Sequence, residues 1–190
     1  MKRVVLLHGN GGGRGTDNWF PYIKSELQKL DIVCEAPDLP DPVLARSKYW
    51  LPYFRNVLKL GPDDLVVGHS SGAVAILKYA ENYKIGASVL VGTYYTDLGY
   101  EDEKTSGYFD TPWQWDKIKS NQRWTAIFAS PDDPYIPIQE PQFIRDRLGS
   151  TYFELPNEGH FGGHTHPKLK FPELFQFLKE KLASPTAHYR

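Results

Sequence analysis

The chain has 190 residues, of which 41% are hydrophobic, and its formal net charge is −1 at pH 7. This length and composition predict one globular domain over residues 1–190. The near-neutral charge disfavours nucleic acid and anionic membranes as partners, and no apolar stretch reaches the length of a membrane span. Cys34 has no second cysteine to pair with, so we expect a cytoplasmic protein.

Strands and helices are expected to alternate along the chain. Short apolar runs predict strands at 4–7, 32–36, 65–67, 87–91, 124–129 and 151–155. Apolar residues at helical spacing predict helices at 19–30, 50–60, 73–80, 113–119, 139–148 and 171–182. This alternation predicts a parallel sheet with helices on both faces, and functional loops at the carboxyl ends of its strands.

The segment 94–121 departs from this pattern, because it is polar, rich in aromatic residues and weakly periodic. It is longer than an ordinary connection, which is typical of functional segments. We interpret it as a small cap-like excursion with one short helix. The alternative is a loop packed by its own aromatic residues.

Gly68-His69-Ser70-Ser71-Gly72 lies between an expected strand and an expected helix. A serine between two glycines at such a turn is typical of a nucleophile elbow, in which Ser70 would attack a carbonyl carbon. The N–H of Ser71, at the start of the helix, would then stabilise an oxyanion. The alternative is a serine that merely caps the helix.

The glycine-rich loop 9–13 follows the first expected strand. It lacks the lysine of the G-x-x-x-x-G-K-[ST] pattern, which argues against a phosphate-binding loop. We expect the backbone N–H of Asn10 or Gly11 to complete the oxyanion hole beside Ser71.

Asp132, Asp133 and His160 follow the last two expected strands, so the chain order is serine, aspartate, histidine. An imidazole must take the serine proton, and a carboxylate must hold the imidazole in the correct tautomer. A plain Asp-Pro turn is the alternative for the aspartates. His160 could instead join His164 and His166 in a metal site, although the spacing suggests no scaffold for one.

The chain resembles the retinoblastoma-binding-protein type of serine hydrolase over nearly its whole length. The segments that carry the resemblance are Gly9-Asn10-Gly11-Gly12-Gly13, Leu39-Pro40-Asp41-Pro42, Trp50-Leu51-Pro52, Gly68-His69-Ser70-Ser71-Gly72-Ala73, Ser106-Gly107-Tyr108-Phe109, Pro112-Trp113-Gln114-Trp115 and Asp132-Asp133-Pro134. The resemblance implies a three-layer α/β-hydrolase fold, with about six mostly parallel strands and helices on both faces. It also implies Ser70 as nucleophile, Asp133 rather than Asp132 as acid and His160 as base. We expect no cofactor and no metal.

One feature of that family is not carried over. Proteins that bind the retinoblastoma protein use an L-x-C-x-E motif, whereas this chain has Ile32 and Ala36 around Cys34. Retinoblastoma-protein binding is therefore not expected.

We predict a serine hydrolase that cleaves a small ester, amide or short peptide through an acyl-enzyme on Ser70. The residues expected to wall its substrate pocket are His69, Tyr94, Phe109, Trp113, Trp115 and Phe161. One alternative is a protein-interaction module that keeps the fold with little turnover. Another is a metal-dependent hydrolase that uses the histidine-rich loop.

Overall fold

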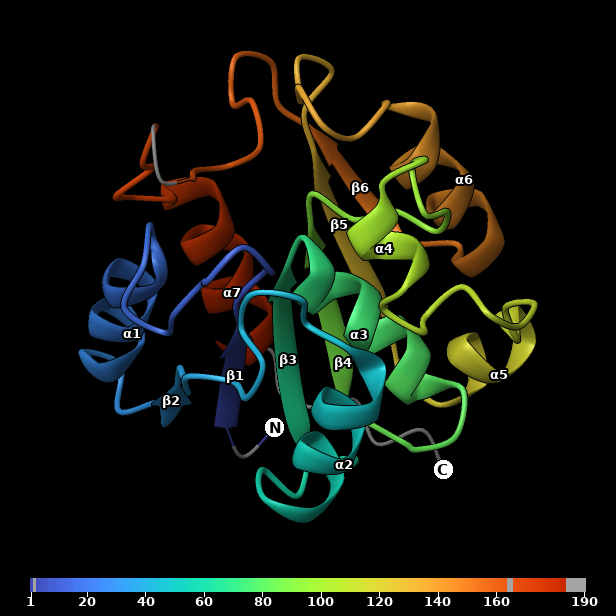
Figure 1. Cartoon of the computed structure of the whole chain (residues 1–190). Helices are drawn as coiled ribbons and strands as arrows, with labels where there is room; N and C mark the ends of the chain where they lie inside the picture. The colour runs from blue at the N-terminus through green and yellow to red at the C-terminus, as the bar shows by residue number, and fades with distance from the viewer. Residues whose placement is uncertain (2, 164–165, 184–190) are drawn as a thin grey trace.

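A computed structural model describes residue 1, residues 3–163 and residues 166–183. Its centre is a six-stranded sheet with the strand order β2-β1-β3-β4-β5-β6 (Figure 1). Every neighbouring pair of strands is parallel, which confirms the predicted sheet. The strands are β1 (Arg3–Leu7), β2 (Cys34–Glu35), β3 (Asp64–His69), β4 (Ala87–Val91), β5 (Thr125–Ala129) and β6 (Thr151–Glu154).

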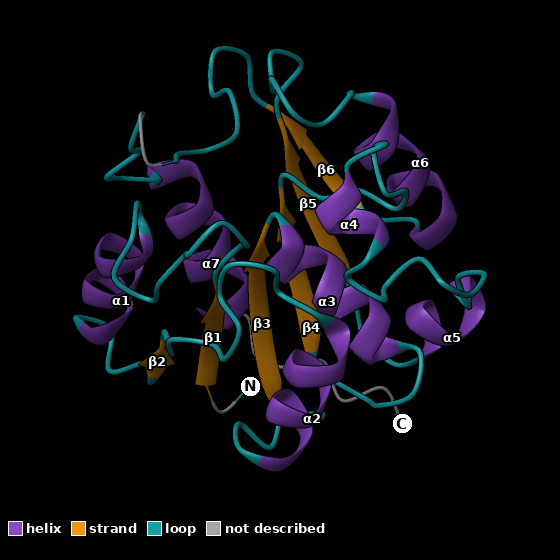
Figure 2. Ribbon diagram, in the orientation of Figure 1, coloured by secondary structure: helices purple, strands orange, loops and turns teal. Residues whose placement is uncertain are grey.

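Helices cover both faces of the sheet, so the molecule has three layers (Figure 2). The helices are α1 (Phe20–Gln28), α2 (Ser47–Asn56), α3 (Ser71–Ala80), α4 (Glu101–Lys104), α5 (Trp115–Ser120), α6 (Gln139–Leu148) and α7 (Pro172–Ala183). One face packs against α1 and α7. The other face packs against α2, α3, α5 and α6.

The sequence of β1 shows how the sheet acquires two cores. Val4 and Leu6 contribute to the core under α1 and α7, whereas Val5 and Leu7 point into the core under α3. All four side chains are fully buried. A strand that is covered on both faces needs a continuous apolar run rather than an alternating one, which is the pattern found here.

The main differences from the expected elements lie at β2, α2 and α4. β2 has two residues rather than the expected 32–36, because the preceding Val33 is 57% exposed at the edge of the sheet. α2 begins at Ser47, before the expected start at 50. α4 was not expected at all.

Among the described residues, no helix has both the length and the apolar character needed to cross a bilayer. Residues 184–190 lie outside the described residues.

Candidate active site

Ser70 occupies the sharp turn between β3 and α3. Its backbone has φ 55° and ψ −125°, a strained conformation for a residue with a side chain. A Cβ atom on Gly68 would lie 2.6 Å from the Ala73 nitrogen, and one on Gly72 would lie 2.4 Å from the Leu7 carbonyl oxygen. Both glycines are therefore required by close approach of the backbone, as the elbow interpretation predicts.

His160 and Asp133 come together from the loops after β6 and β5. The Nδ1 atom of His160 lies 2.7 Å from Oδ2 of Asp133. The other carboxylate oxygen, Oδ1, accepts the backbone N–H groups of Tyr135 at 2.9 Å and Ile136 at 3.1 Å. The carboxylate is thus fixed in orientation and places the imidazole proton on Nδ1, which leaves Nε2 free to accept a proton.

Asp132 has different partners from Asp133. Its carboxylate accepts hydrogen bonds from the Ser130 hydroxyl at 2.6 Å and from the backbone N–H groups of Asn157 at 2.8 Å and Gly159 at 3.2 Å. The Ser130 bond is the main reason why the pKa of Asp132 is lowered. Asp132 therefore ties the loop that carries His160 to the end of β5.

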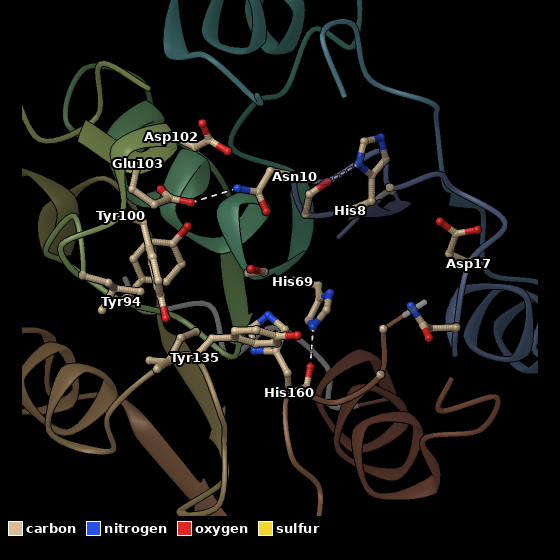
Figure 3. Close-up of a pocket in the computed structure, with 18 of the residues that line it drawn as sticks. His8, Asn10, Asp17, His69, Tyr94, Tyr100, Asp102, Glu103, Tyr135 and His160 are labelled. Atoms are coloured by element: carbon tan, nitrogen blue, oxygen red, sulfur yellow. Dashed lines mark hydrogen bonds between the residues drawn. The ribbon is translucent and has the colours of Figure 1, made fainter. Parts of the chain in front are cut away.

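His69 contacts the same loop from the nucleophile side. Its Nε2–H donates to the backbone carbonyl of His160 at 2.7 Å, and the two rings are 4.9 Å apart (Figure 3). Burial lowers the pKa of His69 to about 3, so its ring stays neutral. His69 lines the pocket as expected, and it also connects the elbow to the His160 loop.

The glycine-rich loop after β1 lies beside Ser70. A Cβ atom on Gly9 would be 3.5 Å from the Ser70 Oγ. Within the described part of the chain, the N–H groups of Asn10 and Ser71 have no backbone acceptor. The N–H of Gly11 instead donates to the Val43 carbonyl at 2.9 Å. Gly11 is therefore engaged elsewhere, which corrects the expectation that it could serve the oxyanion hole.

A cavity of about 540 Å³ opens above these residues. Ser70 and His160 both line it, together with Asn10, His69 and Tyr94. Its other aromatic and acidic lining residues are Phe20, Tyr100, Tyr135, Asp17, Glu101, Asp102 and Glu103. This volume suits a small-molecule ligand.

Phe109, Trp113 and Trp115, which were expected in the pocket wall, do not line this cavity. They belong to an aromatic cluster that packs on the core formed with α3. In that cluster Trp113 stacks on Trp115 at 5.5 Å and donates its indole N–H to the Tyr95 carbonyl at 2.8 Å. The alternative of a segment packed by its own aromatic residues therefore describes them.

Phe161 also lies outside the cavity wall. Its side chain is fully buried and stacks on Phe171 with ring centres 5.3 Å apart. Its carbonyl accepts the indole N–H of Trp19 at 3.0 Å. Phe161 directly follows His160, so its burial anchors this part of the loop in the core, and its side chain does not line the cavity.

The sequence interpretation missed Gly92 and Glu103. A Cβ atom on Gly92 would lie 3.3 Å from the His160 Cε1, so this glycine leaves room for the imidazole ring. Glu103 on α4 accepts a 2.9 Å hydrogen bond from the side-chain amide of Asn10. A glycine directly after a strand was the available signal for Gly92, whereas no pattern in its polar surroundings marked Glu103.

No group of three or more metal-binding side chains occurs among the described residues. His164, one member of the histidine-rich alternative, lies outside them. Of the remaining two, His160 is paired with Asp133.

Known proteins resemble this chain over nearly its whole length. A family model described as serine hydrolase matches residues 4–179. "Serine hydrolase RBBP9" from Rattus norvegicus is 38% identical over 182 residues, which cover 95% of each chain.

Solved structures show the same fold. The ydeN gene product of Bacillus subtilis superimposes with a TM-score of 0.87 at 22% identity, over 97% of this chain and 100% of its own. The α/β hydrolase MGS-M2, from a deep-sea metagenome library, gives a TM-score of 0.73 at 13% identity, over 100% and 92%. The expected α/β-hydrolase fold is thereby confirmed.

Proposed function

The chain belongs to the serine hydrolase family, and from that premise we propose that it cleaves a small ester, amide or short peptide through an acyl-enzyme on Ser70. The observation that carries this proposal is the hydrogen-bonded pair of His160 and Asp133 in the wall of the cavity that holds Ser70. A serine hydroxyl needs an adjacent base to become nucleophilic at neutral pH. This pair supplies a base in the correct tautomer.

The reaction proceeds in two halves. The Ser70 Oγ attacks the substrate carbonyl carbon while its proton passes to Nε2 of His160. The tetrahedral intermediate then breaks its bond to the leaving group, which takes that proton and departs. A water molecule, deprotonated by His160, attacks the acyl carbon and breaks the bond to Ser70, which regains a proton. Asp133 stabilises the imidazolium in both halves.

The N–H groups of Ser71 and Asn10 serve as the oxyanion hole. Ser71 is the first residue of α3, so its N–H has no partner within the helix and adds to the positive end of the helix dipole. Asn10 sits on the loop that approaches Ser70 through Gly9. Donors fixed in advance at such positions are a large part of catalysis in acyl transfer.

The cavity wall suggests which acyl groups the enzyme prefers. Phe20, Tyr94, Tyr100 and Tyr135 offer aromatic surface, which suits apolar or aromatic groups. A panel of p-nitrophenyl esters of increasing acyl size and aromaticity measures this preference. Equal values of kcat/KM across the panel would show that the aromatic wall does not select the substrate.

Mass spectrometry of the protein mixed briefly with p-nitrophenyl acetate tests the acyl-enzyme. We expect one acetyl group on Ser70 and a burst of nitrophenol whose size matches the enzyme concentration. Such a burst requires that deacylation be slower than acylation. Steady turnover without a burst, and without an acetylated peptide containing Ser70 after acid quenching, would contradict this order of rates. Turnover that survives Ser70→Ala would contradict the mechanism as a whole.

A further inference from the structure

Glu103 places a buried carboxylate in the wall of the cavity that holds Ser70. The residue is only 6% exposed. Its Oε1 accepts the 2.9 Å hydrogen bond from the side-chain amide of Asn10 (Figure 3). Within the described part of the chain, its Oε2 is buried without a hydrogen-bond partner. Burial of an incompletely bonded carboxylate is costly, so a function is expected to offset that cost.

Asn10 needs support from outside its own loop. Glycines flank it on both sides, and Gly11 adopts a positive φ of 71°, so the local sequence imposes little rigidity. Glu103 lies 93 positions further along the chain, and within the described residues it accepts the hydrogen bond of the Asn10 side-chain amide. This bond restrains the residue whose N–H is assigned to the oxyanion hole.

Glu103 is itself held firmly. Its backbone carbonyl accepts the Ser106 hydroxyl at 2.6 Å and the Ser106 N–H at 3.1 Å. The Ser106 carbonyl in turn accepts the N–H of Ser47, at the start of α2, at 2.8 Å. A continuous chain of hydrogen bonds therefore runs from the helical layer through Glu103 to Asn10.

We propose that Glu103 is a positioning residue that acts through the Asn10 side chain to aim the Asn10 backbone N–H at the oxyanion. This inference rests on the proposed serine hydrolase mechanism and deepens it. It gives α4, whose four residues lie far from the elbow in sequence, a role in the chemistry at Ser70.

The surroundings of Glu103 also shift the pKa of its carboxyl group. Burial raises the pKa of its carboxyl group above the ordinary value, although the nearby Tyr94 and Ser71 hydroxyls and the Asn10 amide oppose the shift. A glutamine at this position would keep a side-chain oxygen that can accept from Asn10.

The test compares kcat and KM for p-nitrophenyl acetate in the wild type, Glu103→Ala, Glu103→Gln and Asn10→Ala. We expect Glu103→Ala to lower kcat about tenfold to hundredfold with KM nearly unchanged, since loss of a whole oxyanion donor costs about 10²–10³. Glu103→Gln should stay within about threefold of the wild type, because its amide oxygen can accept from Asn10. Asp110→Ala removes an exposed acid from the same segment and should change nothing.

Asn10→Ala removes the same hydrogen bond from its other end. It should reproduce the loss seen in Glu103→Ala, and the double variant should be no slower than either single one. A boronic acid that mimics the tetrahedral intermediate should lose affinity in parallel with kcat. If Glu103→Ala does not fold, Asn10→Ala still decides, because wild-type kcat in that variant would overturn the proposal.

Two results separate this inference from the function on which it rests. If the wild type is active, two outcomes overturn the positioning role alone. One is full activity of Glu103→Ala, and the other is a double variant of Glu103→Ala and Asn10→Ala in which the two losses of kcat multiply. A folded wild type that neither turns over nor becomes acylated at Ser70 overturns the hydrolase proposal, and the positioning role with it.

Discussion

Replacing Asp133 by asparagine should disable the base without disturbing its surroundings. In the structure, Oδ1 of Asp133 accepts two backbone N–H groups, from Tyr135 and Ile136, so this position must remain an oxygen. The amide nitrogen of Asp133→Asn must then take the place of Oδ2, 2.7 Å from Nδ1 of His160. An amide N–H at that place requires Nδ1 to be the acceptor.

This reversal moves the imidazole proton to Nε2, which can then no longer take the proton of Ser70. Replacement of a triad carboxylate by its amide in this way costs about 10⁴-fold in kcat, which corresponds to about 5.5 kcal/mol of transition-state free energy. The matched variant, Asp132→Asn, keeps an oxygen for Ser130 and Asn157 and loses at most the 3.2 Å bond to Gly159. We expect it to lose less than about tenfold.

Steady-state hydrolysis of p-nitrophenyl acetate at neutral pH measures both variants, with circular dichroism and thermal unfolding as the controls for folding. A severe loss in Asp133→Asn with a mild one in Asp132→Asn is the expected result. The opposite order, in folded proteins, would show that Asp132 is the catalytic acid and would refute the tautomer reasoning.

Three further predictions concern stability and reactivity. Gly72→Ala should lower the free energy of unfolding by about 3 kcal/mol, because its Cβ would lie 2.4 Å from the Leu7 carbonyl oxygen. Gly163→Ala is the control, because a Cβ at that position meets nothing within 4 Å. Equal denaturation midpoints for the two variants would contradict the prediction. His69 stays neutral in the folded protein down to a pKa of about 3, whereas the unfolded chain protonates it below pH 6.5, so stability should fall by about 2 kcal/mol from pH 6.5 to 5. His69→Gln should flatten this dependence of stability on pH, which urea titrations at several pH values measure. If the pH dependence is the same in His69→Gln, other groups cause it. Burial raises the pKa of Cys34 to about 12, so a disulfide reagent should modify this thiol at pH 8 only when the protein unfolds. Rapid modification of the native protein would contradict this prediction, because it requires an accessible thiolate.

The sheet was predictable because the pattern that identifies its strands lies within short stretches of sequence. Continuous apolar runs such as Val4–Leu7 can be satisfied only by burial on both faces, and the sequence shows those runs directly. β2 was overestimated because Ile32 and Val33 look like core residues, but the edge of the sheet leaves Val33 exposed. α2 was placed too late because the apolar spacing that marks it begins at Trp50, whereas the first turn of the helix, from Ser47, is polar.

The site was predictable only where backbone geometry dictates residue type. The glycines at 68 and 72 mark the turn that carries Ser70, and the loops after β5 and β6 bring Asp133 to His160. Long-range contacts leave no such trace in the sequence. The bond from Asn10 to Glu103 joins two polar segments, and nothing in either segment identifies its partner.

The aromatic residues failed as pocket markers for a related reason. Trp113 and Trp115 have the composition of a binding site, but apolar surface can be buried equally well against other side chains. Here the stacked pair packs onto the helical layer, and only Tyr94 of the aromatic residues expected from this segment reaches the cavity.

Mass spectrometry after treatment with a fluorophosphonate probe tests the central claim most directly, with Ser70→Ala as the control. An activated serine beside a neutral imidazole reacts with this probe, whereas an ordinary surface serine does not. We predict a single label on Ser70 in the wild type and none in the variant. Folded wild-type protein that stays unlabelled, or that is labelled equally in Ser70→Ala, would contradict the account and favour an interaction module that retains only the fold.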